Sequence, residues 1–226
     1  AERVTATLVN HWASKGHTVH LVTVASRDQD HYDLVGQVER TALGVDSDSQ
    51  SALQALGSNL RRLRAVRKVL LGSKPDIALG MMSTATCMLT LAAAGTHVPV
   101  VGSERIHPPR LPLGSAWESV RRMVYPRTSR IVAQTEQSAG WLREHTGARH
   151  VVVIPNPVEY PLPSLAPRLP PPLVGDKRWL LSVGRVTAQK NFEHLIAAFA
   201  KVAFDLPDWN LAILGEGDLR AGLLDR

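Results

Sequence analysis

A dense group of prolines divides the chain into two parts. Eight of its 15 prolines lie between Pro155 and Pro172. Because proline fixes φ and has no backbone N–H to donate, a segment this rich in proline cannot form a helix or a central strand. Within the 226 residues we therefore expect a first domain over residues 1–158, a stiff linker over 159–176 and a second domain over 177–226.

Short apolar, β-branched runs alternate with longer helical patterns on both sides of the linker. Such alternation is typical of a parallel sheet covered on both faces, so we predict an α/β chain of two doubly wound, Rossmann-like domains. The first domain begins on a helix without its usual preceding strand and the second has few strands, so both are expected to be partial. Strands are expected at residues 18–24, 76–79, 98–102, 130–133, 151–154, 179–183 and 211–214, and helices at 2–12, 50–71, 115–125, after 135, 191–204 and from 219.

The composition excludes several classes of protein. Hydrophobic residues make up 44% of the chain and charged residues 20%, which is ordinary globular usage and excludes a wholly disordered protein. The single cysteine, Cys87, cannot pair within the chain, so a disulfide scaffold is excluded and a reducing, cytoplasmic compartment is favoured. The net charge of +6 comes without a nucleic-acid-binding motif and with only 5% aromatic residues, so no nucleic acid partner is expected.

The most informative motif follows the first expected strand of the second domain. That strand should end at Gly184, and a short loop then places Arg185 and Lys190 near the start of the next helix. Ligands of open α/β sheets bind beyond the carboxyl ends of the strands, and helix N-termini attract anions. Two cations at this position could hold a diphosphate, the arginine contacting its oxygens bidentately. The alternative is two solvated loop cations, and spacing alone does not separate the two.

A second glycine turn, Gly215-Glu216-Gly217, follows the next expected strand. Glycine lets a backbone approach a ligand closely. An ordinary tight turn explains the pattern equally well, because it lacks the third glycine of a dinucleotide-binding loop.

Together these motifs resemble a known family. The run from Val183 to Lys190, followed by Leu214-Gly215-Glu216-Gly217, resembles the start of the C-terminal domain of family 4 glycosyltransferases. Ser103-Glu104-Arg105 resembles the subgroup acting in polysaccharide and lipid-linked oligosaccharide assembly. Further segments similar to the family are residues 1–4, 15–19, 134–136, 154–158, 195–199 and 207–209.

The resemblance implies the GT-B fold and a retaining enzyme. Such an enzyme moves a sugar from a nucleotide-diphosphate sugar to a glycan or polyprenyl-diphosphate-linked acceptor, without a cofactor or an obligatory metal, and the sequence shows no cluster of metal ligands. Gly184, Arg185 and Lys190 would bind the donor diphosphate, where fixed cations stabilise the charge of the leaving group. Gly215, Glu216 and Gly217 would lie near the nucleotide.

The resemblance also places residues of the first domain on the acceptor side. Glu104, after an expected strand, would be the catalytic carboxylate, orienting acceptor hydroxyls or stabilising an oxocarbenium-like centre; an ion pair with Arg105 is the alternative. Glu2, Arg3 and Arg105 would lie near the acceptor, although a glutamate at a helix start is also plain complementarity to the helix dipole.

A basic helix is expected over residues 50–71. Its cations and its apolar residues fall on different faces. Such a helix suits an anionic membrane surface or an acceptor phosphate, which would put the protein peripherally on the inner face of a membrane. A solvated helix face is the alternative. The cations are Arg61, Arg62, Arg64, Arg67 and Lys68.

Two other functions stay open at this point. A nucleotide-sugar epimerase shares the GT-B fold and the diphosphate site, but not the glycine-arginine-lysine spacing of this loop. A non-catalytic fragment that binds a membrane or a partner through the basic helix is the other. Since the family's Glu-x7-Glu element and the glycine pair before Ala1 are absent from the sequence, we expect the 226 residues to be an inactive piece of a longer enzyme.

Overall fold

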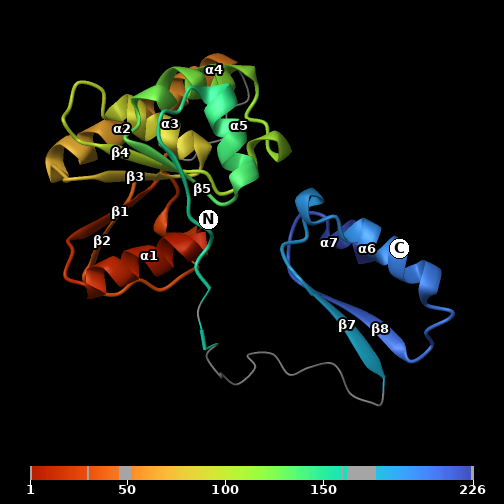
Figure 1. Ribbon diagram of the computed structural model, residues 1–226. Coiled ribbons are helices and arrows are strands. Elements are labelled where there is room, and N and C mark those ends of the chain that lie inside the picture. The colour runs from red at the N-terminus through yellow and green to blue at the C-terminus, as the bar shows by residue number, and fades with distance from the viewer. Residues whose placement is uncertain (1, 30, 46–51, 159, 162–176, 225–226) are drawn as a thin grey trace. The chain divides into compact units, whose positions relative to one another are not determined.

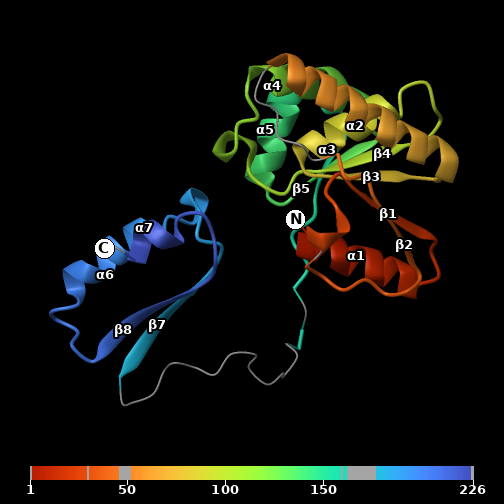
Figure 2. The same ribbon diagram turned by 180° about the vertical axis from the view of Figure 1, so that it is seen from behind.

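Parallel strands form the framework of both parts of the chain (Figures 1 and 2). The computed structural model describes residues 2–29, 31–45, 52–158, 160–161 and 177–224. The chain divides into two compact units, Ala1–Glu159 and Tyr160–Arg226, which we treat separately as unit 1 and unit 2. Most of the expected linker, residues 159–176, lies outside the described residues.

Unit 1 holds two parallel sheets. The smaller pairs β1 with β2, and the larger has the order β3-β4-β5-β6. Every pairing is parallel, as the alternation of apolar runs and helices predicts. The bounds are β1 (Val19–Thr23), β2 (Val38–Ala42), β3 (Ala78–Met81), β4 (Val100–Ser103), β5 (Arg130–Ala133) and β6 (Val151–Val153).

The helices of unit 1 cover these sheets from different sides. Helix α1 contacts β1 and β2, whereas the others lie on one side of the larger sheet (Figures 1 and 2). Because β3 to β6 follow one another in the sheet and parallel crossovers are right-handed, the connecting helices fall on the same face. The bounds are α1 (Glu2–Ser14), α2 (Ala52–Ser73), α3 (Ser83–Ala92), α4 (Ser115–Val124) and α5 (Glu136–Thr146), with 3₁₀ turns η1 (Arg27–Gln29), η2 (Pro108–Arg110) and η3 (Tyr125–Arg127).

Local sequence signals set the ends of α5. The Thr135 hydroxyl accepts a hydrogen bond from the Ser138 backbone N–H at 3.2 Å, which satisfies one of the free N–H groups of the first turn. Gly147 ends the helix with φ of 65°, a left-handed conformation that glycine adopts without strain. The strand-helix-strand order around α5 therefore follows from residues readable in the sequence.

Close packing of α3 on the larger sheet depends on two glycines. A Cβ atom on Gly80 would lie 2.6 Å from the Thr86 Cα, and one on Gly102 would lie 2.5 Å from the Thr86 Cγ2. The Thr86 hydroxyl donates to the Gly80 carbonyl at 3.0 Å. Next to this contact the main core gathers buried residues of α3, α4, η3, β5 and α5, including Cys87, Tyr125, Ile131 and Leu142.

Unit 2 is a parallel strand pair with helices. β7 (Arg178–Val183) pairs in register with β8 (Trp209–Leu214). Between them lie η4 (Ala188–Lys190) and α6 (Phe192–Val202), and α7 (Arg220–Leu224) follows β8. The strand-helix-strand order predicted for this part of the chain is confirmed.

The structure differs from the predicted elements at β2 and at the first residues of several strands. The sequence pattern does not indicate β2, because Glu39 and Arg40 interrupt its apolar character. β3 begins at Ala78 rather than at Asp76, since residues 76 and 77 precede the pairing with β4, and Ile77 is exposed. Among the described residues, no helix has the length and apolar character needed to cross a membrane.

The glycine contact of α3 gives the first testable prediction. Replacing Gly80 by alanine forces a Cβ atom against the backbone of Thr86, so we expect Gly80→Ala to lower the free energy of unfolding of unit 1 by about 1–3 kcal/mol. Urea denaturation followed by circular dichroism measures the change. Gly140→Ala in α5 is the matched control, because its Cβ atom meets nothing within 4 Å. Equal stability of the two variants would contradict the packing.

Candidate functional site

The carboxyl end of β4 carries a buried carboxylate. Glu104 is 3% exposed, and its Oε2 accepts a hydrogen bond from the Ser83 hydroxyl at 2.6 Å. Its Oε1 accepts a hydrogen bond from the Tyr125 hydroxyl. Residues from the end of β4, the first turn of α3 and the end of α4 therefore meet at one carboxylate, which faces the interior of unit 1.

The cation beside this carboxylate is Arg121 of α4, not Arg105. Arg121 is 1% exposed, and its Nη1 lies 3.7 Å from the Glu104 Oε1. Its Nη2 donates to both carboxylate oxygens of Glu118, at 2.5 and 2.6 Å. The guanidinium lies 4.9 Å from the ring centre of Trp141. The ion pair that the sequence suggested as the alternative for Glu104 is thus made with a different arginine.

Sequence reasoning missed Arg121 and Tyr125, although a signal for Arg121 exists. Along α4, Trp117, Val120, Arg121 and Val124 share one face at helical spacing, and that face is turned to the core. An arginine on the apolar stripe of an amphipathic helix needs a buried partner. Nothing in the sequence says that the partner comes from the end of β4.

The hydroxyl and thiol groups around Glu104 are held in their neutral forms. Burial, and then the charge of Glu104, raise the pKa of Tyr125 well above its usual range. Burial and the same charge raise the pKa of the Cys87 thiol to about 12. Tyr125 therefore acts as a hydrogen-bond donor to the carboxylate, and Cys87 as an inert core residue.

The turn from β3 into α3 is strained. Met82 lies between them with φ of 79° and ψ of 159°, a region that residues other than glycine rarely occupy. Its N–H donates to the Ser103 carbonyl at 2.9 Å, which continues the pairing of β3 with β4. The strained turn positions Ser83 for its hydrogen bond to Glu104. Backbone strain of this kind is concentrated at functional sites.

Further polar groups follow the carboxyl ends of β4 and β5 and lie in the first turn of α5. Arg105 follows Glu104, and its Nη1 reaches the Ser103 hydroxyl at 3.4 Å. His107 Nδ1 lies 3.1 Å from the Ser138 hydroxyl. Two buried nitrogen atoms, Nη2 of Arg105 and Nε2 of Gln134, make no hydrogen bond within the described protein. The register of β4 and β5 thus places Arg105 at the same sheet edge as Gln134, which the sequence did not single out for a site.

Glu2 and Arg3 lie in the first turn of α1, and both are exposed. Their side chains make no hydrogen bond or ion pair in the described part of unit 1. An acidic residue at this helix start also fits the helix dipole. A role on the acceptor side stays a prediction for both.

The basic helix α2 uses part of its charge inside unit 1. Arg67 Nη1 donates to the carbonyls of Ala92 and Ala94, at 2.5 and 2.8 Å, where α3 ends. Arg62 Nε donates to the Val45 carbonyl at 2.8 Å. Both arginines therefore stabilise the packing of unit 1, whereas Arg61, Arg64 and Lys68 are exposed.

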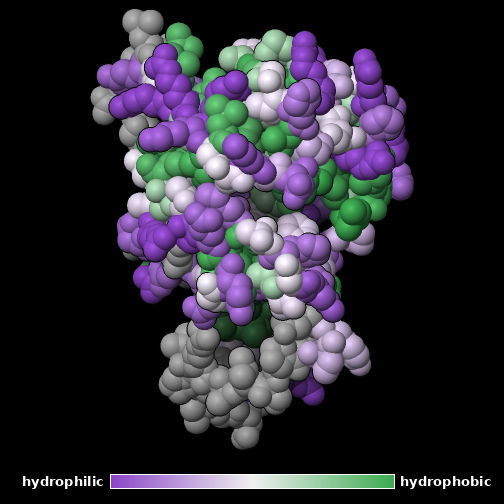
Figure 3. Space-filling view, turned by 90° about the vertical axis from the view of Figure 1, so that its left-hand side faces the viewer, coloured by the Kyte–Doolittle hydropathy of each residue, from purple (hydrophilic) through white to green (hydrophobic). Residues whose placement is uncertain are grey.

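The sequence predicts separate faces for the cations and the apolar residues of α2, and this prediction is wrong for part of the helix, because exposed hydrophobic side chains accompany the exposed cations. Leu56, Leu60 and Leu71 are 69%, 42% and 50% exposed. On the face drawn in Figure 3, hydrophobic and hydrophilic side chains likewise lie interspersed. The exposed surface of α2, which we define as Leu56, Leu60, Arg61, Arg64, Lys68 and Leu71, is therefore both basic and apolar.

In unit 2 the loops after β7 and β8 touch through their glycines. A Cβ atom on Gly215 would lie 1.8 Å from the Gly184 carbonyl oxygen, and one on Gly217 would lie 2.3 Å from that of Val186. Backbone hydrogen bonds of 3.0 Å from the Gly184 N–H to the Leu214 carbonyl and 2.8 Å from the Val186 N–H to the Glu216 carbonyl join the same loops. These glycines are needed for the contact between the loops, whatever else they bind.

The two cations of the first loop are exposed and free of carboxylates. Arg185 and Lys190 form no ion pair in the described residues, whereas Glu216, 85% exposed, pairs with Arg220 at 3.4 Å. The Lys190 chain lies against Gly184, where an added Cβ atom would be 3.7 Å from its Cδ. Gly184, Arg185 and Lys190 are therefore together at the carboxyl end of β7, ahead of α6.

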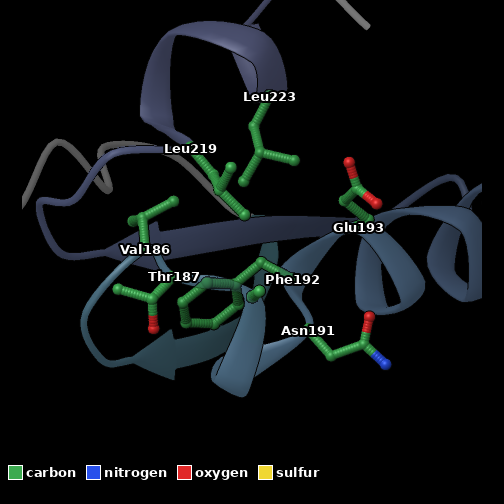
Figure 4. A pocket seen from close by; sticks show the side chains of 8 residues that line it. Val186, Thr187, Asn191, Phe192, Glu193, Leu219 and Leu223 are labelled. Carbon is green, nitrogen blue, oxygen red and sulfur yellow. The ribbon is translucent and has the colours of Figure 1, made fainter. Parts of the chain in front are cut away.

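A hollow of about 200 Å³ lies beside this loop. Figure 4 shows Leu219, just before α7, and Leu223 of α7 pointing toward Phe192 of α6 across it. The remaining lining residues are Val186, Thr187, Ala188, Asn191 and Glu193. Neither Arg185 nor Lys190 lines the hollow, so the candidate diphosphate site is a different surface of the same loop.

Family comparisons divide the chain at nearly the same place as the structure. Residues 1–160 match the family model described as Glycosyltransferase Family 4, and residues 169–226 match the model described as glycosyl transferases group 1. No curated protein matches the sequence.

Several solved structures share the fold at low sequence identity. A sucrose-phosphate synthase from Thermosynechococcus elongatus has a TM-score of 0.72 and 14% identity over 97% of the chain. A lipopolysaccharide outer core galactosyltransferase has a TM-score of 0.62 and 16% identity over 99% of the chain. A UDP-N-acetylglucosamine 2-epimerase from Rickettsia bellii has a TM-score of 0.59 and 16% identity over 98% of the chain. The chain spans 60%, 59% and 60% of these proteins, respectively. The likeness establishes the GT-B type of α/β fold.

The buried ion pair predicts a large stability effect. Replacing Arg121 by methionine leaves Glu104 buried without its cation, and removal of one partner of a buried pair costs about 3–5 kcal/mol of unfolding free energy. Urea denaturation of Arg121→Met checks this. Arg122→Met, on the exposed side of the same helix, is the control and should change stability by about 0.5 kcal/mol or less. Similar losses in both variants would refute the pairing.

The raised pKa of Cys87 predicts slow alkylation in the folded state. At pH 9 its thiolate population is far smaller than in the unfolded chain, where the pKa is near 9.0, so iodoacetamide should react at least about a hundredfold more slowly without urea than with it. Because the folded-state pKa is raised, this group's contribution to stability is complete below pH 9.0 and is lost as the pH rises toward about 12. Equal alkylation rates with and without urea would show that the thiol is not buried.

Proposed function

Because the chain belongs to glycosyltransferase family 4, we propose that it acts in the transfer of a sugar from a nucleotide-diphosphate sugar to a glycan or lipid-linked acceptor, with retention of anomeric configuration. The observation that carries this proposal is the pair of exposed, carboxylate-free cations, Arg185 and Lys190, at the carboxyl end of β7. An anionic ligand fits this arrangement, because it would supply the missing negative charge.

The loop has a direct use in glycosyl transfer. As the bond between sugar and diphosphate breaks, negative charge builds on the departing diphosphate. Arg185 can donate to two phosphate oxygens at once and Lys190 adds a point charge, so both stabilise the transition state more than the bound donor. The Lys190 chain lies against Gly184, and the turn from Gly215 to Gly217 would lie near the nucleotide. On this account no metal or other cofactor is required.

In unit 1 the same proposal assigns the acceptor to the carboxyl edge of the larger sheet, near Arg105, with Glu2 and Arg3 as further candidates. A catalytic role for Glu104 stays a prediction. Its burial and its hydrogen bonds with Ser83 and Tyr125 support a positioning role, in which it holds the backbone before Arg105.

A nucleotide-sugar epimerase is the second candidate, since one of the structurally similar proteins is a UDP-N-acetylglucosamine 2-epimerase. Its product would be an epimerised free nucleotide sugar, whereas a transferase makes a new glycosidic linkage. Product analysis by mass spectrometry and NMR separates the two.

Nucleotide binding tests the donor site. Calorimetric titration with UDP, GDP and ADP should reveal binding by the chain, and Arg185→Gln or Lys190→Gln should weaken the tightest of these interactions by about tenfold or more, because each removes a charge-assisted hydrogen bond to the diphosphate. Lys201→Gln removes an exposed charge from α6 and should leave the affinity unchanged. Loss of binding in the control alone, or in none of the variants, would contradict the site.

The exposed surface of α2 supports peripheral binding to an anionic membrane. Its leucines can enter the lipid interface while Arg61, Arg64 and Lys68 contact the headgroups, a placement that suits a lipid-linked acceptor and a protein on the cytoplasmic face. A solvated helix face needs no exposed leucines, which is why we favour the membrane.

Vesicle binding tests this surface. Removing two charges with Arg64→Gln and Lys68→Gln should weaken sedimentation with phosphatidylglycerol vesicles by about tenfold or more, at roughly 1 kcal/mol per charge. The control removes the same charge from unit 2 with Lys177→Gln and Lys201→Gln. Equal binding by both double variants would show that α2 is only a solvated face.

A further inference from the structure

Two unpaired donors lie at the ends of neighbouring strands in unit 1. Ser103 of β4 is in register with Val132 of β5, and the Glu104 N–H donates to the Val132 carbonyl at 2.8 Å, so pairing continues past the end of β4. Continuing this register places Arg105 opposite Gln134, on strands about 4.8 Å apart. Nη2 of Arg105 and Nε2 of Gln134 are both buried and make no hydrogen bond within the described protein.

The guanidinium of Arg105 is partly withdrawn from water. Burial lowers the pKa of Arg105, which reflects a cation that has lost solvent. The carboxylate next to it in the chain, Glu104, is turned into the core toward Ser83, Tyr125 and Arg121. A partly desolvated cation without a carboxylate partner is unfavourable by itself and is stabilised by an anion.

The backbone that carries these donors is held on both sides. Glu104 is anchored by the hydroxyls of Ser83 and Tyr125. On the other side, His107 meets the Ser138 hydroxyl, which also receives a hydrogen bond from the Thr135 hydroxyl at 3.0 Å. Turn η2 contacts α5 in the same region. Donors fixed in this way are preorganised for a ligand.

We propose that Arg105 and Gln134 together bind a phosphate-bearing group. The guanidinium donates two parallel N–H bonds to an oxyanion, and the amide N–H of Gln134 donates to a further oxygen, so a ligand with several acceptor oxygens and negative charge satisfies both. The assignment rests on the proposed function in one respect: because the donor diphosphate belongs to Arg185 and Lys190, this second phosphate group comes from the acceptor.

Pyrophosphate binding tests the pair in a chain whose donor site has been removed. In the 226-residue chain carrying Arg185→Gln and Lys190→Gln, calorimetry should still detect pyrophosphate binding. Adding Arg105→Gln should weaken it by about tenfold or more, and adding Gln134→Met, which keeps the volume but removes the donor, by about threefold or more. Arg105→Lys keeps the charge but lacks the planar guanidinium. Its pyrophosphate affinity should therefore lie between that of the chain with Arg105 and that of Arg105→Gln.

The control is Arg110→Gln, an exposed arginine of the same loop, which should leave the affinity unchanged. Circular dichroism confirms that each variant is folded. Absence of pyrophosphate binding in the donor-site background, or equal losses in Arg105→Gln and Arg110→Gln, would overturn the proposal. The proposed function fails by a separate result, if Arg185→Gln and Lys190→Gln leave nucleoside diphosphate binding intact.

Discussion

The buried carboxylate of Glu104 joins three elements of unit 1. It receives hydrogen bonds from Ser83 at the start of α3 and from Tyr125 after α4, and it faces Arg121. A buried charge is tolerated only where such partners surround it, so the elements that supply them must keep their relative positions. The edge of the larger sheet, where Arg105 and Gln134 lie, is therefore fixed from the inside by this buried cluster.

Both units place their candidate functional residues in the same topological position. In a parallel α/β sheet all strands end on one edge, and loops leaving that edge can bring together residues that are distant in sequence. In unit 1 these are Arg105 and Gln134, and in unit 2 they are Arg185 and Lys190. Glycines allow the loops to meet closely, as Gly215 does at the Gly184 carbonyl. The parallel order of the strands in each unit thus accounts for the position of both the proposed donor site and the proposed acceptor site.

Most elements of the fold could be predicted because their signals are local. Apolar β-branched runs indicated β1, β5 and β7, and Thr135 and Gly147 mark the ends of α5. β2 could not be predicted, since its charged residues give no apolar pattern and its pairing with β1 is a long-range contact. The cations of α2 could not be told apart in the sequence either, because their partners also come from distant residues. Arg67 binds carbonyls at the end of α3, whereas Arg64 faces solvent.

The sequence alone determined the α/β class, the position of the proline-rich boundary and the loop with Arg185 and Lys190, because each depends on residue types at short spacing. Tertiary structure decided which arginine pairs with Glu104, which cations of α2 stay exposed and which donors are left without a partner. Those outcomes depend on desolvation, and a side chain loses water only when elements far apart in the sequence pack against it. Arg105 and Arg121 are the same residue type, yet their surroundings differ. Packing encloses Arg121 beside two carboxylates, whereas Arg105 keeps an unpaired donor for the proposed ligand.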